Sequence, residues 1–200
     1  MRAIILDIIM AAGIFAAIIF GAFTDFSQQC EAVQHSVLRL HIPANSDSVE
    51  DQAIKLKLRD MLLEQYGAQL SNCPSLEAAH SKVKALLPEI DAAADRFLIE
   101  NGANYSADAQ LVTMYFTTRQ YGNVTLPAGR YDALRITLGS GEGHNWWCVM
   151  YPALCLSAIG DELPTELCDE NTSIYPFLSD EPTNVEIRFA LFEFLKNLFS

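Results

Sequence analysis

One short stretch of the chain gathers side chains that can do chemistry. His41 is followed by Asn45, Asp47 and Asp51. Histidine can act as a general base and carboxylates can hold a metal ion, so catalysis is one interpretation of this stretch. The same polar residues also cap helices and turns, because their side-chain oxygens accept hydrogen bonds from free backbone N–H groups. We interpret His41, Asn45 and Asp47 as contacts for a partner protein, and we expect no catalytic residue and no bound metal.

A second stretch, GSGEGHNWWC from Gly139, combines glycines with aromatic residues. It matches neither the GxGxxG motif nor a P-loop ending in Lys-Ser/Thr, so we expect no nucleotide cofactor and indeed no cofactor of any kind. A turn that presents Asn145, Trp146 and Trp147 to a partner is the better interpretation. Adjacent side chains on an extended segment point to opposite faces, so one tryptophan can be buried while its neighbour contacts a partner. Burial of both in the core is the alternative.

The cysteines point to oxidising surroundings. The sequence has five of them, without a CxxC pair or a Cys/His spacing typical of zinc sites. Cys148 and Cys155 flank Pro152, and a disulfide between them would close a small loop if the chain leaves the reducing cytosol. The alternative makes Cys148 a nucleophile with His144 as its base, although no third group is evident to orient the histidine.

An apolar leader precedes these residues. Ile4 to Phe23 is apolar apart from Asp7, and about 20 helical residues span the roughly 30 Å core of a bilayer. Arg2 would hold the N-terminus on the cytoplasmic side. We assign residues 1–24 as a signal peptide or membrane anchor. Whether a signal peptidase removes this segment stays open, because Gly21–Phe23 does not form a clean small-x-small cleavage signal.

The composition indicates a folded, acidic domain behind the leader. The formal net charge is −12 and the hydrophobic content is 50%. Such a chain can build a core, and its charge repels phosphate backbones. We therefore expect a folded domain over residues 30–200 that does not bind nucleic acid.

Three segments predict strands. Val37–Ile42 alternates apolar and polar residues and ends at Pro43, which is typical of a half-buried strand. Gln110–Thr118 and Tyr131–Leu138 are rich in β-branched and aromatic residues, as strands are.

Apolar residues at helical spacing predict three helices in the domain. One helix is expected from the capping box at Ser48 to Gly67, with Asp51, Lys55 and Arg59 on a solvated stripe. Further helices are expected over 75–101, across a proline, and over 187–199. Together these elements predict an α+β fold: one exported domain with a small, mainly antiparallel sheet packed by helices, behind the hydrophobic leader.

Three strings carry a family resemblance. They are LRLHIPANSDSVEDQAIKLKLR over 38–59, YGNVTLPAGRYDALR over 121–135 and GSGEGHNWWCVMYPALC over 139–155. The chain resembles the stage II sporulation protein R family of endospore-forming bacteria. The resemblance implies export from the forespore into the space between two membranes. There such proteins trigger a membrane-embedded aspartic-type protease, the sporulation sigma-E factor processing peptidase, which cleaves pro-sigma-E in the mother cell.

By this resemblance the chain is a signalling protein and not an enzyme. Its implied partners are that peptidase and, through the leader, the membrane. Two alternatives stay open from the residues themselves. One is an extracytoplasmic hydrolase that acts on an envelope component, and the other is an anchored structural protein of the envelope.

Overall fold

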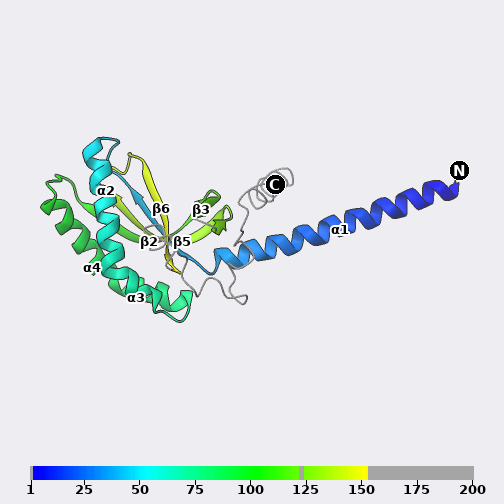
Figure 1. Ribbon diagram of the computed structural model, residues 1–200, viewed down its shortest axis with the longest axis horizontal. Helices are drawn as coiled ribbons and strands as arrows, with labels where there is room; N and C mark the ends of the chain where they lie inside the picture. The colour runs from blue at the N-terminus through cyan, green and yellow to red at the C-terminus, as the bar shows by residue number, and fades with distance from the viewer. Residues whose placement is uncertain (1, 122–123, 153–200) are drawn as a thin grey trace.

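The computed structural model describes residues 2–121 and 124–152 of the 200-residue chain (Figure 1). A long helix, α1 (Arg2–Gln34), leads into an α+β domain. The helix expected over 187–199, and Cys155 with it, lies outside the described residues.

The domain is built on a four-stranded sheet in the order β2-β5-β1-β6. Strand β1 (Leu38–Pro43) runs parallel to β5 (Gly129–Leu138) and antiparallel to β6 (Asn145–Tyr151). Strand β2 (Ala107–Phe116) pairs antiparallel with β5. A hairpin of β3 (Arg119–Tyr121) and β4 (Val124–Leu126) connects β2 to β5. Two of the three sheet pairings are antiparallel, which confirms the predicted fold class.

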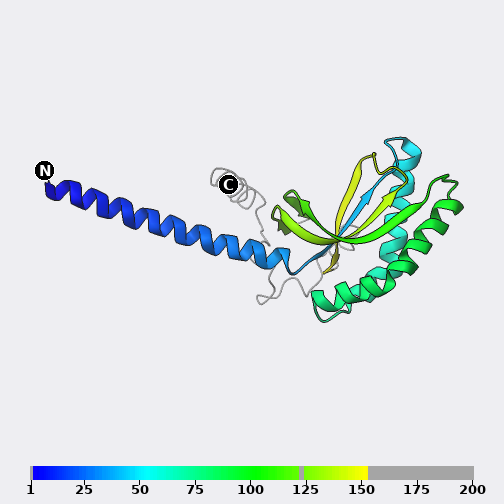
Figure 2. The same cartoon turned by 180° about the vertical axis from the view of Figure 1, so that it is seen from behind.

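Helices cover one face of this sheet. Figures 1 and 2 show α2 (Val49–Leu62), α3 (Ala68–Ser71) and α4 (Leu76–Glu100) together on one side, with α1 projecting away from the domain. Ser48 and Ser75 cap the first N–H groups of α2 and α4. The main core lies between these helices and the sheet. Its fully buried members include Leu40, Ile42, Leu58, Leu62, Ile90, Leu98, Leu134 and Ile136.

Gly67 does not end the first domain helix, contrary to the prediction. The chain passes through a π-helical turn (Leu63–Gly67) into α3, and Gly67 itself keeps helical angles, with φ −57° and ψ −50°. The extra turn brings Leu70 into the core, where it is fully buried. Burial of a leucine, worth about 1.5–3 kcal/mol, outweighs the roughly 1 kcal/mol preference of glycine for leaving a helix.

The expectation of a half-buried β1 is wrong, because all six of its residues are buried. The alternation is real: Leu38, Leu40 and Ile42 face the helices, while Arg39 and His41 face the other way. That opposite side of the sheet, called the second face below, has a smaller apolar cluster of its own. Its buried members are Cys30, Val33, Val37, Phe116, Leu126, Tyr131, Ala133 and Val149.

Helix α4 also protects one edge of the sheet. The carboxylate of Asp95 accepts a hydrogen bond from the backbone N–H of Ala107 at 2.7 Å, and Asp91 accepts one from Ala109 at 2.8 Å. These N–H groups lie on the outer edge of β2, where another strand could pair with them. Two carboxylates one helical turn apart therefore block strand addition at the start of β2.

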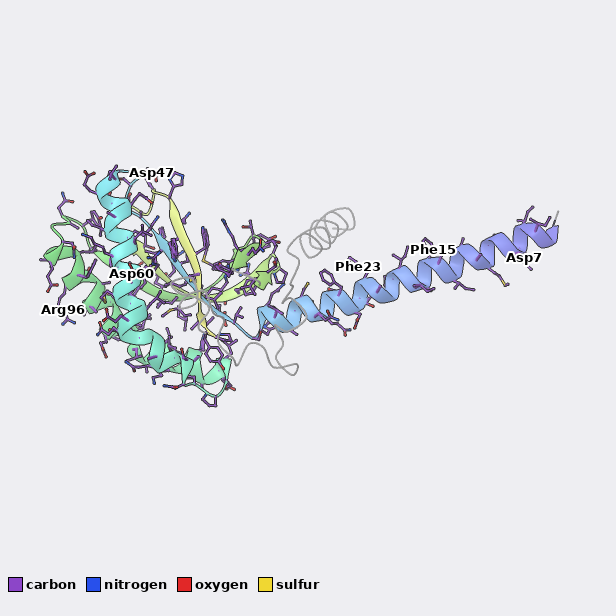
Figure 3. The ribbon with its side chains drawn as sticks, in the orientation of Figure 1. Asp7, Phe15, Phe23, Asp47, Asp60 and Arg96 are labelled. Carbon is purple, nitrogen blue, oxygen red and sulfur yellow. The ribbon has the colours of Figure 1, made fainter. Side chains whose placement is uncertain are left out.

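Helix α1 is long and apolar enough to cross a bilayer. Its mean hydropathy is 2.5 over the most apolar window, and its large side chains stand exposed, as Figure 3 shows for Phe15. These properties fit a signal sequence as well as an anchor. The last turns of α1 differ, because Cys30 and Val33 are buried in the cluster on the second face.

Candidate functional site

The two stretches first singled out in the sequence meet at one end of the sheet, in the loop junction of residues 44–51 and 139–144. Asn45 holds the two loops together. Its Oδ1 accepts a hydrogen bond from the backbone N–H of Ser140 at 3.0 Å, and its backbone carbonyl accepts one from the Ser140 hydroxyl at 2.7 Å. Its Nδ2 donates to Asp51 at 2.9 Å. The side chain of Asn45 is therefore occupied inside the domain.

The carboxylate of Asp51 is the main hydrogen-bond acceptor of the loop junction. It accepts from the hydroxyls of Ser46 and Tyr105, at 2.5 and 2.6 Å, and from Asn45. Burial raises the pKa of this carboxyl, but the hydrogen bonds outweigh burial and hold the pKa below its ordinary value. Its position in the first turn of α2 also suits a negative charge. Asp51 thus joins three segments of the chain.

Two glycines let the loops approach closely. A Cβ at Gly139 would lie 2.2 Å from Oδ1 of Asn45, and one at Gly143 would lie 2.2 Å from the backbone oxygen of Ser46. Gly139 also has φ +53°, in the left-handed region that favours glycine. The glycines of the GSGEG string therefore serve loop packing.

Asp47 lies at the outer tip of the domain (Figure 3). Its Oδ1 accepts a hydrogen bond from the backbone N–H of His144 at 2.6 Å and contacts the ring Nδ1 of the same residue. These contacts, the backbone hydrogen bond first, lower the pKa of Asp47. Both side chains are exposed, at 55% and 81%, so the pair contributes little to stability. It remains available to solvent and to other molecules.

The stripe of Asp51, Lys55 and Arg59 is not a solvated face, contrary to the expectation. Lys55 is 4% exposed and donates from Nζ to the backbone oxygen of His144 at 2.9 Å. The guanidinium carbon of Arg59 lies 4.3 Å from the ring centre of Trp146. The loop before β6 and the start of β6 cover this stripe, which explains its burial.

A second cluster lies on the second face, where Arg39 and His41 of β1 adjoin Arg135 of β5. We call these three residues the basic row. Arg39 is fully buried, with its guanidinium carbon 4.0 Å from the ring centre of Phe116 and 4.9 Å from that of Tyr131. Its Nη2 donates to the Tyr121 hydroxyl. Burial lowers the pKa of Arg39, yet arginine stays charged in proteins, so the aromatic rings surround a buried cation.

His41 connects the row to β6. Its ring stacks on Trp147, with 3.9 Å between centroids and 9° between planes, and its Nε2 is 3.0 Å from Oδ1 of Asn145. The pKa of His41 is lowered, and burial is the largest cause. The charge of Arg135 also lowers it, while the hydrogen bond to Asn145 acts in the opposite direction. The ring is therefore neutral at neutral pH.

The predicted contact residues thus separate into groups. His41, Asn145 and Trp147 come together on the second face, while Asn45 and Asp47 belong to the loop junction. Trp146 packs on the helix side of the sheet, so the two tryptophans do point to opposite faces. Cys148 is disulfide-bonded. Because Cys155 lies outside the described residues, the pairing of these two remains a prediction.

The described part of the chain offers no set of ligands for a metal ion. Within residues 2–121 and 124–152, no group of three or more His, Cys, Asp or Glu side chains is arranged to hold an ion.

The comparisons with known proteins decide the family. The model of the family described as "Stage II sporulation protein R (spore_II_R)" matches residues 34–161. The chain belongs to this family. It is also 33% identical over 189 residues to "Stage II sporulation protein R" of Bacillus subtilis (strain 168), covering 84% of each chain. No solved structure matches it. Family membership gives the chain a role in sporulation, and the matched residues include the loop junction and the basic row.

Part of the second cluster was not predicted from the sequence. Arg39 and Arg135 lie inside the family strings but resemble ordinary polar positions of strands, and Phe116, Tyr121 and Tyr131 were not singled out. One signal was present. A basic residue in the strand VLRLHI, flanked by leucines, becomes buried if that strand is central, because a central strand can be covered on both faces.

Proposed function

We propose that this chain is an exported sporulation signal that activates the membrane-embedded sigma-E factor processing peptidase and so triggers cleavage of pro-sigma-E in the mother cell. It acts by binding the part of the peptidase that lies outside the membrane. Family membership and the apolar helix α1 support export to that side of the membrane.

One observation carries the binding role. All three strings that distinguish the family contribute to the second face: Arg39 and His41 from the first, Tyr131 and Arg135 from the second, and Trp147 from the third. Helices α2, α3 and α4 stand on the other side of the sheet (Figure 2), and of the described helices only α1, by its last turns, packs against the second face. Aromatic and arginine side chains near one another are typical of the energetic centre of a protein interface.

We assign His41, Asn145 and Trp147 to the centre of this contact surface and the exposed Asp47 to its rim. Asn45 and Trp146, also expected at the contact, instead shape it from inside the domain: Asn45 is hydrogen-bonded in the loop junction, and the ring of Trp146 packs against Arg59 and the main core.

Reconstitution in a non-sporulating host tests the proposal. The peptidase and pro-sigma-E are produced together with this chain, which is directed either outside the membrane by its own leader or to the cytoplasm without one. We expect precursor cleavage only with the exported chain. Cleavage that is independent of the chain, or equal for the cytoplasmic form, would contradict the proposal.

A titration separates a ligand from a hydrolase. A ligand activates in proportion to its amount until it matches the peptidase. A hydrolase acts at far lower amounts, because each molecule turns over many substrates. Full activation at a hundredth of the peptidase level, roughly, would favour the enzyme.

A further inference from the structure

We propose that the basic row of Arg39, His41 and Arg135 binds a carboxylate group carried by an acidic segment of the partner protein. The inference rests on the proposed function, since it names the chemistry by which the second face recognises its partner.

Each member of the row has a nitrogen without a hydrogen-bond partner. In the described part of the chain, Nε and Nη1 of Arg39 and Nε of Arg135 are buried donors without a partner. Nδ1 of His41 is buried and unpartnered too, but because Nε2 donates to Asn145, Nδ1 becomes a donor only when the ring is protonated. Leaving a buried donor unpaired costs about 1–3 kcal/mol, and more when the group is charged. An acceptor with negative charge would therefore be stabilised by the row.

The three residues are direct neighbours. His41 and Arg135 face each other across the parallel β1–β5 pair, and Arg39 precedes His41 by two positions on the same side of β1. Arg135 donates from Nη2 to the side-chain oxygen of Gln110 at 2.8 Å, which is a neutral acceptor. The described ion pairs of the chain involve other basic residues, namely Arg59, His80 and His144. A chain with 25 acidic residues thus leaves the guanidinium groups of Arg39 and Arg135 without an ion-pair partner within its described part.

The surroundings favour a carboxylate over a phosphate polymer. Aromatic rings of Phe116, Tyr131 and Trp147 wall the row, and they suit a small planar anion between apolar groups. The net charge of −12 repels nucleic acid and anionic lipid surfaces, whereas one or two carboxylates need only a local cationic site. An acidic peptide segment meets both conditions.

The ligand would enter beside Arg135. Asn145 is exposed, and Arg135, Gln110 and Trp147 are half-buried, while Arg39 is fully buried. Because the donors are covered in this state, entry requires the half-buried side chains to move, as interface side chains commonly do on binding.

Acetate is the probe for the first experiment. The full chain, labelled with nitrogen-15 in uncharged micelles, is titrated with sodium acetate and, at equal ionic strength, with sodium chloride. We expect the Nε–H signals of Arg39 and Arg135 to shift and saturate with acetate only. Arg135→Met should weaken this binding at least tenfold, and Arg96→Met, a change at an arginine of α4 on the helix side of the domain (Figure 3), should leave it unchanged. Equal responses to both salts would overturn the site.

The chain itself is the other source of carboxylates, since residues 153–200 include Asp161, Glu162 and Glu166. Replacing all nine acidic residues of this segment by their amides tests that source. An internal acceptor would show itself if, without acetate, the arginine signals of the unsubstituted chain already lie where acetate binding would put them and move to a different position only in this variant. In that case a partner carboxylate is overturned.

The reconstituted peptidase separates the two proposals. Arg39→Met and Arg135→Met should each reduce precursor cleavage tenfold or more per folded molecule, with Arg96→Met at the unsubstituted level. If the chain triggers cleavage and both variants remain fully active, the carboxylate site is wrong and the signalling function stands. If acetate binds as expected but the chain never triggers cleavage, the signalling function is wrong and the site stands.

Discussion

The imidazole of His41 lies flat against the indole of Trp147, with 3.9 Å between their ring centroids. Through this stack the central strand β1 supports an aromatic side chain of the edge strand β6. Trp146, one residue earlier, points to the other side and packs under Arg59. The two tryptophans therefore have different roles.

Trp147→Ala and Trp146→Ala should separate binding from stability. Both rings are half-buried, so we expect each variant to lose roughly 2–3 kcal/mol of unfolding free energy. Only Trp147→Ala should also lose activation per folded molecule, by roughly thirtyfold if Trp147 is a binding hot spot. Denaturant unfolding and peptidase activation, normalised to folded protein, measure the two effects. Equal activation by both variants would remove Trp147 from the contact surface.

Gly143→Ala should destabilise the loop junction. The new methyl group would meet the backbone oxygen of Ser46 at 2.2 Å, and neither loop can move without breaking the bonds of Asn45. We expect a loss of about 1–3 kcal/mol. Glu142→Ala, one residue earlier and exposed, is the control and should change stability by less than about 0.5 kcal/mol. Similar melting temperatures for both variants would show that the loops are not locked.

His41 should make the domain sensitive to mild acid. Its pKa in the folded domain is below the ordinary value of 6.5, chiefly because of burial, with Arg135 contributing. Below about pH 6.5 the unfolded chain binds more protons than the folded one, so stability falls as the pH falls. His41→Gln should flatten this fall below about pH 6.5, and the two profiles should run parallel above about pH 7. Denaturant titrations across this range make the comparison, and an unchanged slope would contradict a buried neutral imidazole.

Removing the edge protection should cause self-association. With Asp91→Ala and Asp95→Ala together, the N–H groups of Ala107 and Ala109 lose their acceptors and become free to pair with another strand. We expect a concentration-dependent rise in mass by light scattering. Asp108→Ala, a change at an exposed residue of the same strand, should leave the mass unaltered.

Apolar periodicity predicted most of the fold. The positions of β1, β2, β5 and α4 follow from alternation, β-branched content and helical spacing, all of which are local properties of the chain. Strand β6 and the β3–β4 hairpin were not predicted. The glycine-rich string before the tryptophans of β6 dominates the local pattern and favours a turn there.

The burial of polar residues was the main failure, and its reason is physical. Lys55 is buried by the loop at His144, and Arg39 by rings at Phe116 and Tyr131. These partners are far away in the sequence, so no local window contains both sides of the contact. The candidate site was predicted where it depends on residue type, as at His41 and Trp147, and missed where it depends on topology.

The end of helix α1 limits how the leader can be removed. Cys30 and Val33 belong to the cluster beneath the second face, and Phe26 packs against it. A cut as late as Phe23 would spare this cluster, whereas a cut beyond Phe26 would strip apolar side chains from below Arg39 and its rings. A cut on the N-terminal side of Phe26 would therefore leave the support of Arg39 intact, and an uncut α1 would join the apolar leader directly to the folded domain.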